Sequence, residues 1–569
     1  MAIEPAPAHE APRPVNVDDA DLEYEAPAQS LREYLPSLPQ LRLRPTLRYR
    51  EWLLLALILL AGAFFRFTGV NWDNGHHLHP DERFLTMVEG AIKPGLVVPA
   101  AKDAPVQVQP ASLLASYFDT ARSGLNPHNV GFGFFVYGTF PLFAVRWLAE
   151  IVNATGYDKV HLLGRALSGL SDLVTVALIY LIGRRLYGAR VGLLAAALVA
   201  FCVMHIQQAH FFVFDSFLVT LITACFYSCV DIAETGRWRS FVLAGVFLGL
   251  ALATKLSMLV FAPIVALAGL IYLWRASSGF RVSSFGLDPA NGPDGTHGPD
   301  GAEGATHASP VAGGGIGFIA HLWDSGLLSR VIGGGALTLL VALLMFRVFQ
   351  PYAFAGPGFF GLQLNPRWLD NIAYQAKTQS GEVDLPPSIQ WAGTEPLLFP
   401  WRHMVAWGMG IPLGLTSWAG FAAAAAVVLW RGRWQHLLVL SWSGLCFVYF
   451  ASVLNKTMRY LLPAYPFFIL LGAWGLVALY QWTRRDLTPS PFPTREGERQ
   501  GNSDGQWPSL VTAEGGPESA EAAPRRSPLL EGEGLGVRSR LALALIAIVV
   551  VASAAWSFAF TRIYTRPVT

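Results

Sequence analysis

The chain has few charged residues for its length. Only 14% of its 569 residues are Asp, Glu, Lys or Arg, whereas a soluble protein usually carries about 25%. Hydrophobic residues make up 53% of the sequence and gather in runs of roughly 20 residues, the length that crosses a bilayer as a helix. The composition therefore excludes an ordinary soluble domain and predicts an all-α polytopic integral membrane protein.

Several other signals are missing. The four cysteines (Cys202, Cys225, Cys229 and Cys446) all lie in apolar segments, so no disulfide framework is expected. The net charge of +2 carries no signature of nucleic-acid binding. No Gly-rich phosphate loop follows a strand pattern, so we expect no nucleotide-sugar site. An early apolar signal-peptide core is also missing.

Arginines decide the predicted orientation of the spans, because basic residues favour the cytoplasmic ends of membrane helices. Arg48 and Arg50 precede the first span at about 52–68. The N-terminus is therefore placed inside, and the loop 70–161 outside. The apolar segment 131–152 is interrupted by Pro141 and Arg146. If it is an interfacial helix on the outer face, the five internal basic clusters all fall inside.

With that choice the sequence predicts about eleven membrane helices. They lie at about 52–68, 162–182, 191–205, 214–232, 240–254, 257–274, 331–349, 404–430, 436–453, 461–482 and 541–560. We expect a disordered cytoplasmic N-terminus (1–49), a first membrane module (50–275), a low-complexity cytoplasmic linker (276–330), a second membrane module (331–483) with an outer loop at 350–403, a low-complexity cytoplasmic insert (484–540), and a last helix with its tail (541–569).

Ionisable residues gather at the predicted outer ends of the spans. Charged groups in or beside lipid are costly unless they pair or line a wet cavity, so their convergence on one face predicts a site. The polar candidates on that face are His79, Asp81, Glu82, Arg83, His210, Asp215, Lys255, Arg459 and Tyr460.

Each candidate also has a plainer interpretation. A proline followed by Asp81 and Glu82 is a common helix start. Asp215 could serve only as the structural partner of Lys255. Arg459 could simply extend its charged end to the membrane–water interface. His210 fits a lining or structural role better than a catalytic one.

The histidine cluster before Asp81 is a weak metal signal. A zinc site on His76, His77 and His79 matches no standard ligand spacing. The sequence therefore indicates no cofactor and no metal ligand, and a divalent ion stays an open alternative.

Several stretches, taken in order, resemble glycosyltransferases of the GT-C superfamily. The likeness is to family 39, the protein O-mannosyltransferase and aminoarabinose transferase group. The stretches are the acidic pair 81–82, then 137–142, 164–168, 180–188, 208–211 followed by Asp215, 253–255 and 459–463. The resemblance covers about 51–275 well and 400–482 loosely. The two low-complexity inserts and the lack of a large soluble luminal module depart from the family's pattern.

The resemblance implies a GT-C fold and a sugar donor carried on a polyprenyl phosphate. Asp81 would take the proton of the acceptor hydroxyl, with Glu82 as orienting partner or alternate base. Lys255 and Arg459 would stabilise the leaving phosphate, with Arg83 closing the site. The substrate-binding residues implied are Asp215, His210, Tyr460 and His79.

We therefore expect an inverting glycosyltransferase in the plasma membrane of a bacterium, with its site facing outside. It would move mannose or a similar sugar from a polyprenyl-phosphate donor to a hydroxyl of a protein, lipid or envelope glycan. Its partners would be donor, acceptor and lipid bilayer, with no nucleic acid. The alternatives are a polyprenyl-lipid flippase or transporter, although no internal repeat supports it, and a non-catalytic lipid-sugar-binding relative.

Overall fold

The computed structural model describes residues 49–96, 116–284, 322–383, 386–484 and 533–564. The predicted disordered N-terminus and most of the two low-complexity segments lie outside these ranges. The described residues of 49–569 belong to one compact unit. Within them the chain is helical, and the one bridge between extended segments joins Phe354 and Leu364. The prediction of an all-α membrane protein with many spans is confirmed.

The helices follow one another with short connections. The α-helices are α1 (Tyr49–Phe67), α2 (Pro80–Ala91), α4 (Phe140–Ile151), α5 (Tyr157–Tyr187), α6 (Ala189–Ala200), α7 (Val203–Ala209), α8 (Asp215–Thr235), α9 (Trp238–Leu252), α10 (Ala262–Ser284), α12 (Leu327–Phe349), α13 (Pro366–Ser380), α14 (Leu398–His403), α15 (Ile411–Arg431), α16 (Trp434–Ser452), α17 (Tyr465–Thr483) and α18 (Glu533–Tyr564). Short 3-10 helices lie at Pro127–Val130, Leu256–Phe261, Pro351–Ala353, Pro386–Trp391 and Met458–Ala464, and a π-helix at Met404–Met409.

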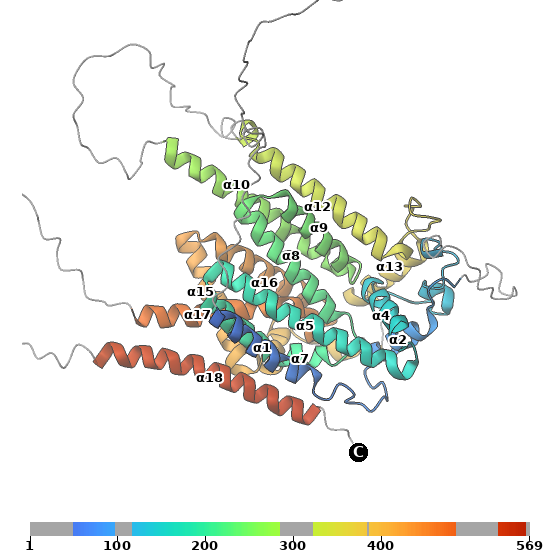
Figure 1. Cartoon of the computed structure of the whole chain (residues 1–569), viewed down its shortest axis with the longest axis horizontal. Helices are drawn as coiled ribbons and strands as arrows, with labels where there is room; N and C mark the ends of the chain where they lie inside the picture. The colour runs from blue at the N-terminus through green and yellow to red at the C-terminus, as the bar shows by residue number, and fades with distance from the viewer. Residues whose placement is uncertain (1–48, 97–115, 285–321, 384–385, 485–532, 565–569) are drawn as a thin grey trace, which may run out of the picture. The chain divides into compact units, whose positions relative to one another are not determined.

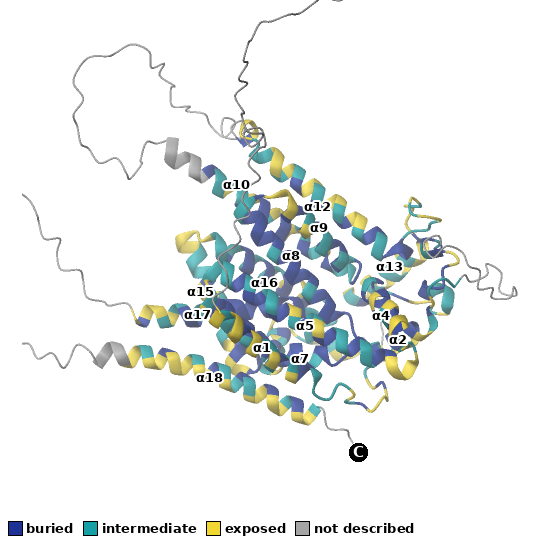
Figure 2. Ribbon diagram, viewed as in Figure 1, coloured by how far each residue is buried: buried dark blue, intermediate teal, exposed yellow. Residues whose placement is uncertain are grey.

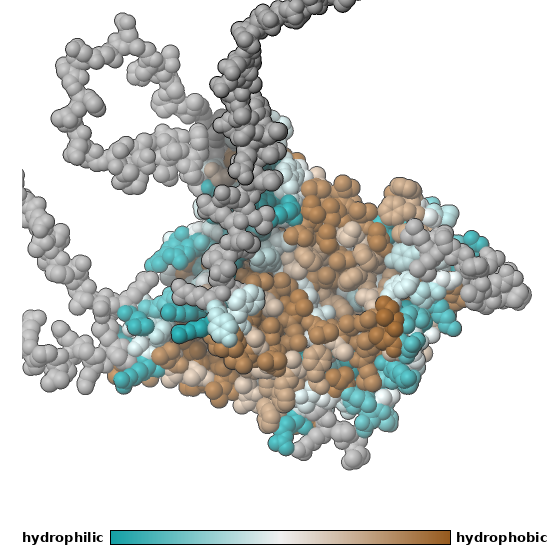
Figure 3. Space-filling view, viewed as in Figure 1, coloured by the Kyte–Doolittle hydropathy of each residue, from teal (hydrophilic) through white to brown (hydrophobic). Residues whose placement is uncertain are grey.

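Eight of the described helices are long and apolar enough to cross a membrane, or nine if α6 and α7 form one broken span. Two predicted spans fall short of that test: α9 has 15 residues, and α1 carries Arg50, Glu51 and Arg66. The predicted count of eleven therefore stays a prediction. Figure 3 shows hydrophobic side chains over the middle of the visible face and hydrophilic ones toward both ends.

Three predicted segments have a different shape in the structure. The predicted span 191–205 bends by 57° between α6 and α7. The predicted span 404–430 begins only at Ile411, because the π-helix before it ends at Met409 and the φ of 83° at Gly410 interrupts the helix. The segment 131–152 forms only the 12-residue α4. At roughly 1.5 Å per residue, α4 is too short to cross a hydrocarbon layer of about 30 Å.

Small residues let the helices in the interior approach closely. Gly245 and Gly249 lie one turn apart on α9 and face α12, where a Cβ on either would collide with the carbonyls of Thr338 and Ala342. This is the small-residue spacing by which membrane helices associate. Among the candidate spans, burial is highest in those that contain α8 and α17 and low in α12 and α18. Figure 2 shows α8 as largely buried and α12 and α18 as carrying many exposed residues. α2, α4 and α13 lie together at one end of the bundle (Figure 1).

Candidate functional site

Helix α2 begins at the acidic motif. The Nδ1 of His79 accepts the N–H of Glu82 at 3.3 Å and so caps the helix, and Pro80 occupies its first turn. The positive end of the helix dipole favours the two carboxylates that follow. Consecutive helical side chains point about 100° apart. Asp81 and Glu82 therefore enter different surroundings.

Glu82 faces a buried arginine on α5. The Nε and Nη2 of Arg165 donate to its two carboxylate oxygens at 2.6 and 3.0 Å. The Nη1 and Nη2 of Arg165 also donate to Asp73 at 3.0 and 2.9 Å, and Nη1 reaches the carbonyl of Val70 at 2.8 Å. The side chains of all three charged residues are fully buried. Arg165 thus ties both the loop before α2 and α2 itself to α5.

The two acids of this cluster have opposite pKa shifts. Burial raises the pKa of Glu82 above its usual value, and the hydrogen bond and charge of Arg165 offset this only in part. Burial also acts to raise the pKa of Asp73, but Arg165 and the backbone N–H groups of Leu78 and Gly75 outweigh it and lower the pKa to about 2. Asp73 is therefore the more firmly ionised partner of Arg165.

Asp81 faces a different arginine. It forms an ion pair with Arg459, which lies in the 3-10 helix before α17, and about a quarter of each side chain is exposed. Burial acts to raise the pKa of Asp81, but the charge and hydrogen bond of Arg459, with a further hydrogen bond to Tyr137, hold it below the usual value. The carboxylate is ionised and partly open to solvent.

A second ion pair lies beside the first. The Nζ of Lys255 donates to Asp215 at 3.3 Å. Lys255 lies 4.3 Å from the ring centre of Tyr460, and the guanidinium of Arg459 lies 5.7 Å from the same ring. The aromatic ring of Tyr460 therefore lies against both cations. We call Asp81, Asp215, Lys255, Arg459 and Tyr460 the Asp81 site.

The first loop is fastened to the backbone next to Lys255. The N–H groups of Gly138 and Phe140 donate to the carbonyls of Thr254 and Ala253 at 3.0 and 3.2 Å. A Cβ at Gly138 would collide with the Ala253 carbonyl, so the close approach requires glycine. This contact brings the neighbouring Tyr137 to Asp81.

The second loop also reaches the site, through α13. The Nε2 of Gln379 lies 3.4 Å from the hydroxyl of Tyr460, and its Oε1 is buried without a hydrogen-bond partner. The backbone carbonyl of Gln379 accepts the N–H of Leu454 at 3.0 Å. A residue from each loop thus contacts a member of the Asp81 site, Tyr137 contacting Asp81 and Gln379 contacting Tyr460.

The remaining predicted site residues have other partners. The exposed Arg83 donates its Nε to the carbonyl of His77 at 2.9 Å. Both ring nitrogens of the buried His210 face carbonyls, those of Ile206 at 2.8 Å and Thr68 at 2.9 Å. These contacts favour structural roles for both side chains. His79 caps α2 and packs its ring 4.3 Å from that of Phe211.

Sequence reasoning missed Asp73, Arg165, Tyr137 and Gln379 as residues around the site. Arg165 carried a signal, because an arginine inside an apolar segment needs an anionic partner. No group of three His, Cys, Asp or Glu side chains comes together as metal ligands among the described residues.

Comparison with known proteins gives a family for part of the chain. Residues 141–282 match the model of the dolichyl-phosphate-mannose-protein mannosyltransferase family. A search of curated protein sequences returns no match.

Solved structures of several membrane glycosyltransferases are similar at low identity. The Archaeoglobus fulgidus oligosaccharyltransferase has a TM-score of 0.47 and 12% identity, over 91% of this chain and 56% of that one. ArnT from Cupriavidus metallidurans, bound to undecaprenyl phosphate, has a TM-score of 0.43 and 14% identity, over 77% and 64%. The S. cerevisiae Pmt1-Pmt2 complex bound to its sugar donor has a TM-score of 0.32 and 16% identity, over 55% and 35%.

This chain thus matches little more than half the length of the archaeal enzyme. The family model covers α4 to α10. Over that part of the chain its match confirms the resemblance seen in the sequence to the protein mannosyltransferase family.

Proposed function

We propose that this chain is an inverting membrane glycosyltransferase that moves a sugar from a polyprenyl-phosphate donor to an acceptor hydroxyl. One observation carries the proposal: the partly exposed carboxylate of Asp81 pairs with Arg459, and Lys255 lies against the same Tyr460 ring as that arginine, at one end of a bundle of membrane helices. A single displacement needs a proton acceptor on one side of the sugar and fixed positive charge where the phosphate leaves.

In the proposed reaction the acceptor oxygen attacks the anomeric carbon of the sugar. The bond from that carbon to the phosphate oxygen breaks, and the polyprenyl phosphate leaves with the electron pair. The acceptor proton moves to a carboxylate oxygen of Asp81. Arg459 can hold the leaving phosphate through two parallel N–H groups, whereas Lys255 acts as a point charge.

The Asp81–Arg459 ion pair gives this mechanism a resting state. In the free protein Arg459 lowers the pKa of Asp81, which makes the carboxylate a weak base. A donor phosphate would compete for Arg459 and free the carboxylate, so its pKa would rise toward the ordinary value. Donor binding and activation of the base are then the same event.

Glu82 fits the orienting role better than that of alternate base. It is fully buried and both its oxygens are bound to Arg165, so an acceptor hydroxyl has no route to it. Asp215 is assigned to hold Lys255 in place through its ion pair. The ring of Tyr460 is assigned to hold both cations through cation–π contacts.

Loss of either cation should impair use of the donor. Purified protein is incubated with polyprenyl-phosphate sugars, and released polyprenyl phosphate is measured. We expect Arg459→Ala and Lys255→Ala to lower kcat/KM for the donor by roughly 10–100-fold, because each removes a charge-assisted contact to phosphate. Arg122→Ala, which removes an exposed arginine of the first loop, serves as the control. Unchanged donor kinetics in both site variants would remove these residues from the site, and no release by the wild-type protein with any sugar would sink the enzyme assignment.

We further propose that the Asp81 site faces outside. The four native cysteines are buried, so an added surface cysteine can be labelled selectively. In intact cells Leu78→Cys, at an exposed position just before α2, should react with a membrane-impermeant maleimide. Trp430→Cys, exposed at the far end of α15, should react only after permeabilisation. The opposite labelling pattern would reverse the proposed orientation.

A further inference from the structure

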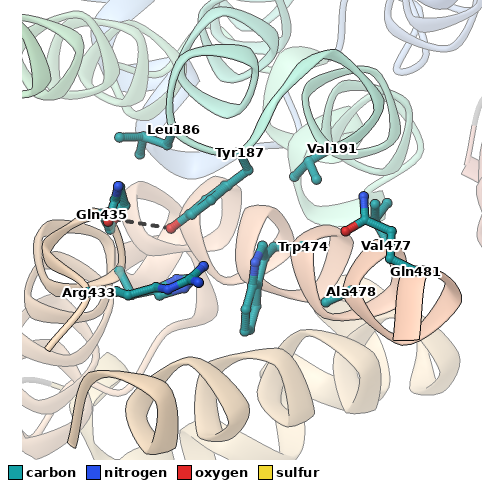
Figure 4. A pocket seen from close by; sticks show the side chains of 10 residues that line it. Leu186, Tyr187, Val191, Arg433, Gln435, Trp474, Val477, Ala478 and Gln481 are labelled. Carbon is teal, nitrogen blue, oxygen red and sulfur yellow. Dashed lines mark hydrogen bonds between the residues drawn. The ribbon is translucent and has the colours of Figure 1, made fainter. Parts of the chain in front are cut away.

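A pocket of about 240 Å³ lies at the other end of the bundle from the Asp81 site. It is formed where the end of α5 meets the start of α16 and the second half of α17 (Figure 4). Tyr187 in its wall is 22 positions after Arg165 on α5, which places the two roughly 33 Å apart along the helix. We call it the Arg433 pocket.

Its walls contain a buried polar atom that no described residue of the chain satisfies. His436 lines the pocket with only 1% of its surface exposed, and its Nδ1 has no hydrogen-bond partner. The ring is held between two aromatic side chains, stacked 5.2 Å from Tyr187 and edge-on 4.3 Å from Trp474. The Tyr187 hydroxyl donates to the carbonyl of Gln435 at 3.2 Å. A buried ring nitrogen without a partner is costly, so it points to a ligand.

The same pocket carries an unpaired positive charge. Arg433 caps the 19-residue α16, and its guanidinium extends between Tyr187 and Trp474 (Figure 4). It has no carboxylate partner in the described part of the chain, and no acidic residue lines the pocket. The first N–H groups of α16 add the positive end of a helix dipole. Gln481 on α17 contributes an amide on the opposite wall.

We infer that the Arg433 pocket binds a phosphate group. Four features favour an oxyanion there: a free guanidinium, an unpartnered imidazole, a helix N-terminus and an amide donor. The volume is well above the roughly 10–15 Å³ that a cavity needs to hold one water molecule, so the group that carries the phosphate also has room. The aromatic walls suit that attached group, because Tyr and Trp rings accept amphiphiles at a membrane surface.

The phosphate can come from a lipid headgroup or from solution, and calorimetric titration separates the two. Full-length protein in detergent is titrated with inorganic phosphate, with dihexanoyl phosphatidic acid and, as a zwitterionic control, with dihexanoyl phosphatidylcholine. Saturable binding of phosphatidic acid alone identifies a lipid headgroup, and binding of inorganic phosphate identifies the anion itself. Both results support the site. Absence of saturable binding of either phosphate overturns it.

Variants assign the binding to this pocket. We expect Arg433→Gln to weaken it by about tenfold or more, the loss expected for a charge-assisted contact. His436→Phe keeps the aromatic stack and should weaken binding several-fold. Arg431→Gln removes an exposed charge two residues away that does not line the pocket, and should change affinity less than twofold. Equal losses in Arg431→Gln and Arg433→Gln would overturn the site in favour of general charge attraction.

A final control separates this pocket from the Asp81 site. The titrations are repeated with Lys255→Ala, which removes a cation at the far end of the bundle. Binding to the Arg433 pocket should persist in that variant, and its loss would overturn the assignment. The inference therefore stands or falls independently of the proposed transferase activity.

Discussion

Asp81→Asn is expected to reduce sugar transfer by roughly 10²–10⁴-fold, the usual contribution of a general base. Asparagine keeps the shape of the side chain but cannot accept the acceptor proton. The protein should still fold, because the Asp81 side chain is 26% exposed. The charge of Asp215 also lies near Arg459 and interacts favourably with it, so the arginine is not left without an anion.

Release of polyprenyl phosphate measures this loss, and donor binding and thermal stability are followed in parallel. Asp119→Asn is the matched control, because Asp119 is also an aspartate of the first loop paired with an arginine, Arg122. It should transfer at the wild-type rate. If Asp81→Asn also transfers at the wild-type rate, Asp81 is not the base.

The pH profile tests the same assignment from a second direction. A base works only when ionised, so the rate falls as the pH drops through its pKa. In the free protein burial acts to raise the pKa of Asp81, but Arg459 holds it below the usual value of an aspartate, so the acid limb of kcat/KM for the donor should lie at lower pH than an ordinary aspartate would give. In the donor complex Arg459 is shared with phosphate, so the limb of kcat should lie at higher pH. Identical limbs would contradict the proposed release of Asp81 by the donor.

Much of the candidate site can be predicted because membranes restrict where charge is stable. Asp81, Lys255 and Arg459 lie far apart in sequence, yet each interrupts or flanks an apolar run, and lipid tolerates such charges only when they converge. The structure pairs Asp81 with Arg459 and Lys255 with Asp215. The start of α2 at Pro80 can also be predicted from the sequence, because helix-capping signals are local.

The features of the site that the sequence does not predict depend on packing between distant segments. Asp81 and Glu82 are neighbours with similar chemistry, and their different surroundings depend on which arginine each meets. Arg165 meets Asp73 across 92 positions and Glu82 across 83, and no periodicity records those contacts. The break at Gly410 is similar, since a π-helix in an apolar run looks like a continuing span.

Arg165→Met is expected to destabilise the protein by about 3–5 kcal/mol, the cost of breaking a buried ion pair from one side. It would leave the carboxylates of Asp73 and Glu82 in a fully buried site with no counter-charge. Because Arg165 also holds α2 to α5, transfer should fail together with stability. Thermal unfolding in detergent measures the change, and Arg122→Met, which removes an arginine whose side chain is 56% exposed, should cost less than about 1 kcal/mol.

Neutralising Asp73 and Glu82 tests whether their buried carboxylates, left without a counter-charge, cause the loss of stability in Arg165→Met. The triple variant Arg165→Met, Asp73→Asn, Glu82→Gln should recover a large part of the lost stability, because replacing all members of a buried ionic cluster is far less costly than removing one. Transfer should recover less than stability. A methionine at position 165 cannot donate hydrogen bonds to residue 82, so it cannot fix the orientation of α2 and of Asp81 upon it. A triple variant as unstable as Arg165→Met alone would show that shape, not charge, holds this corner together, and full recovery of transfer would deny Glu82 its orienting role.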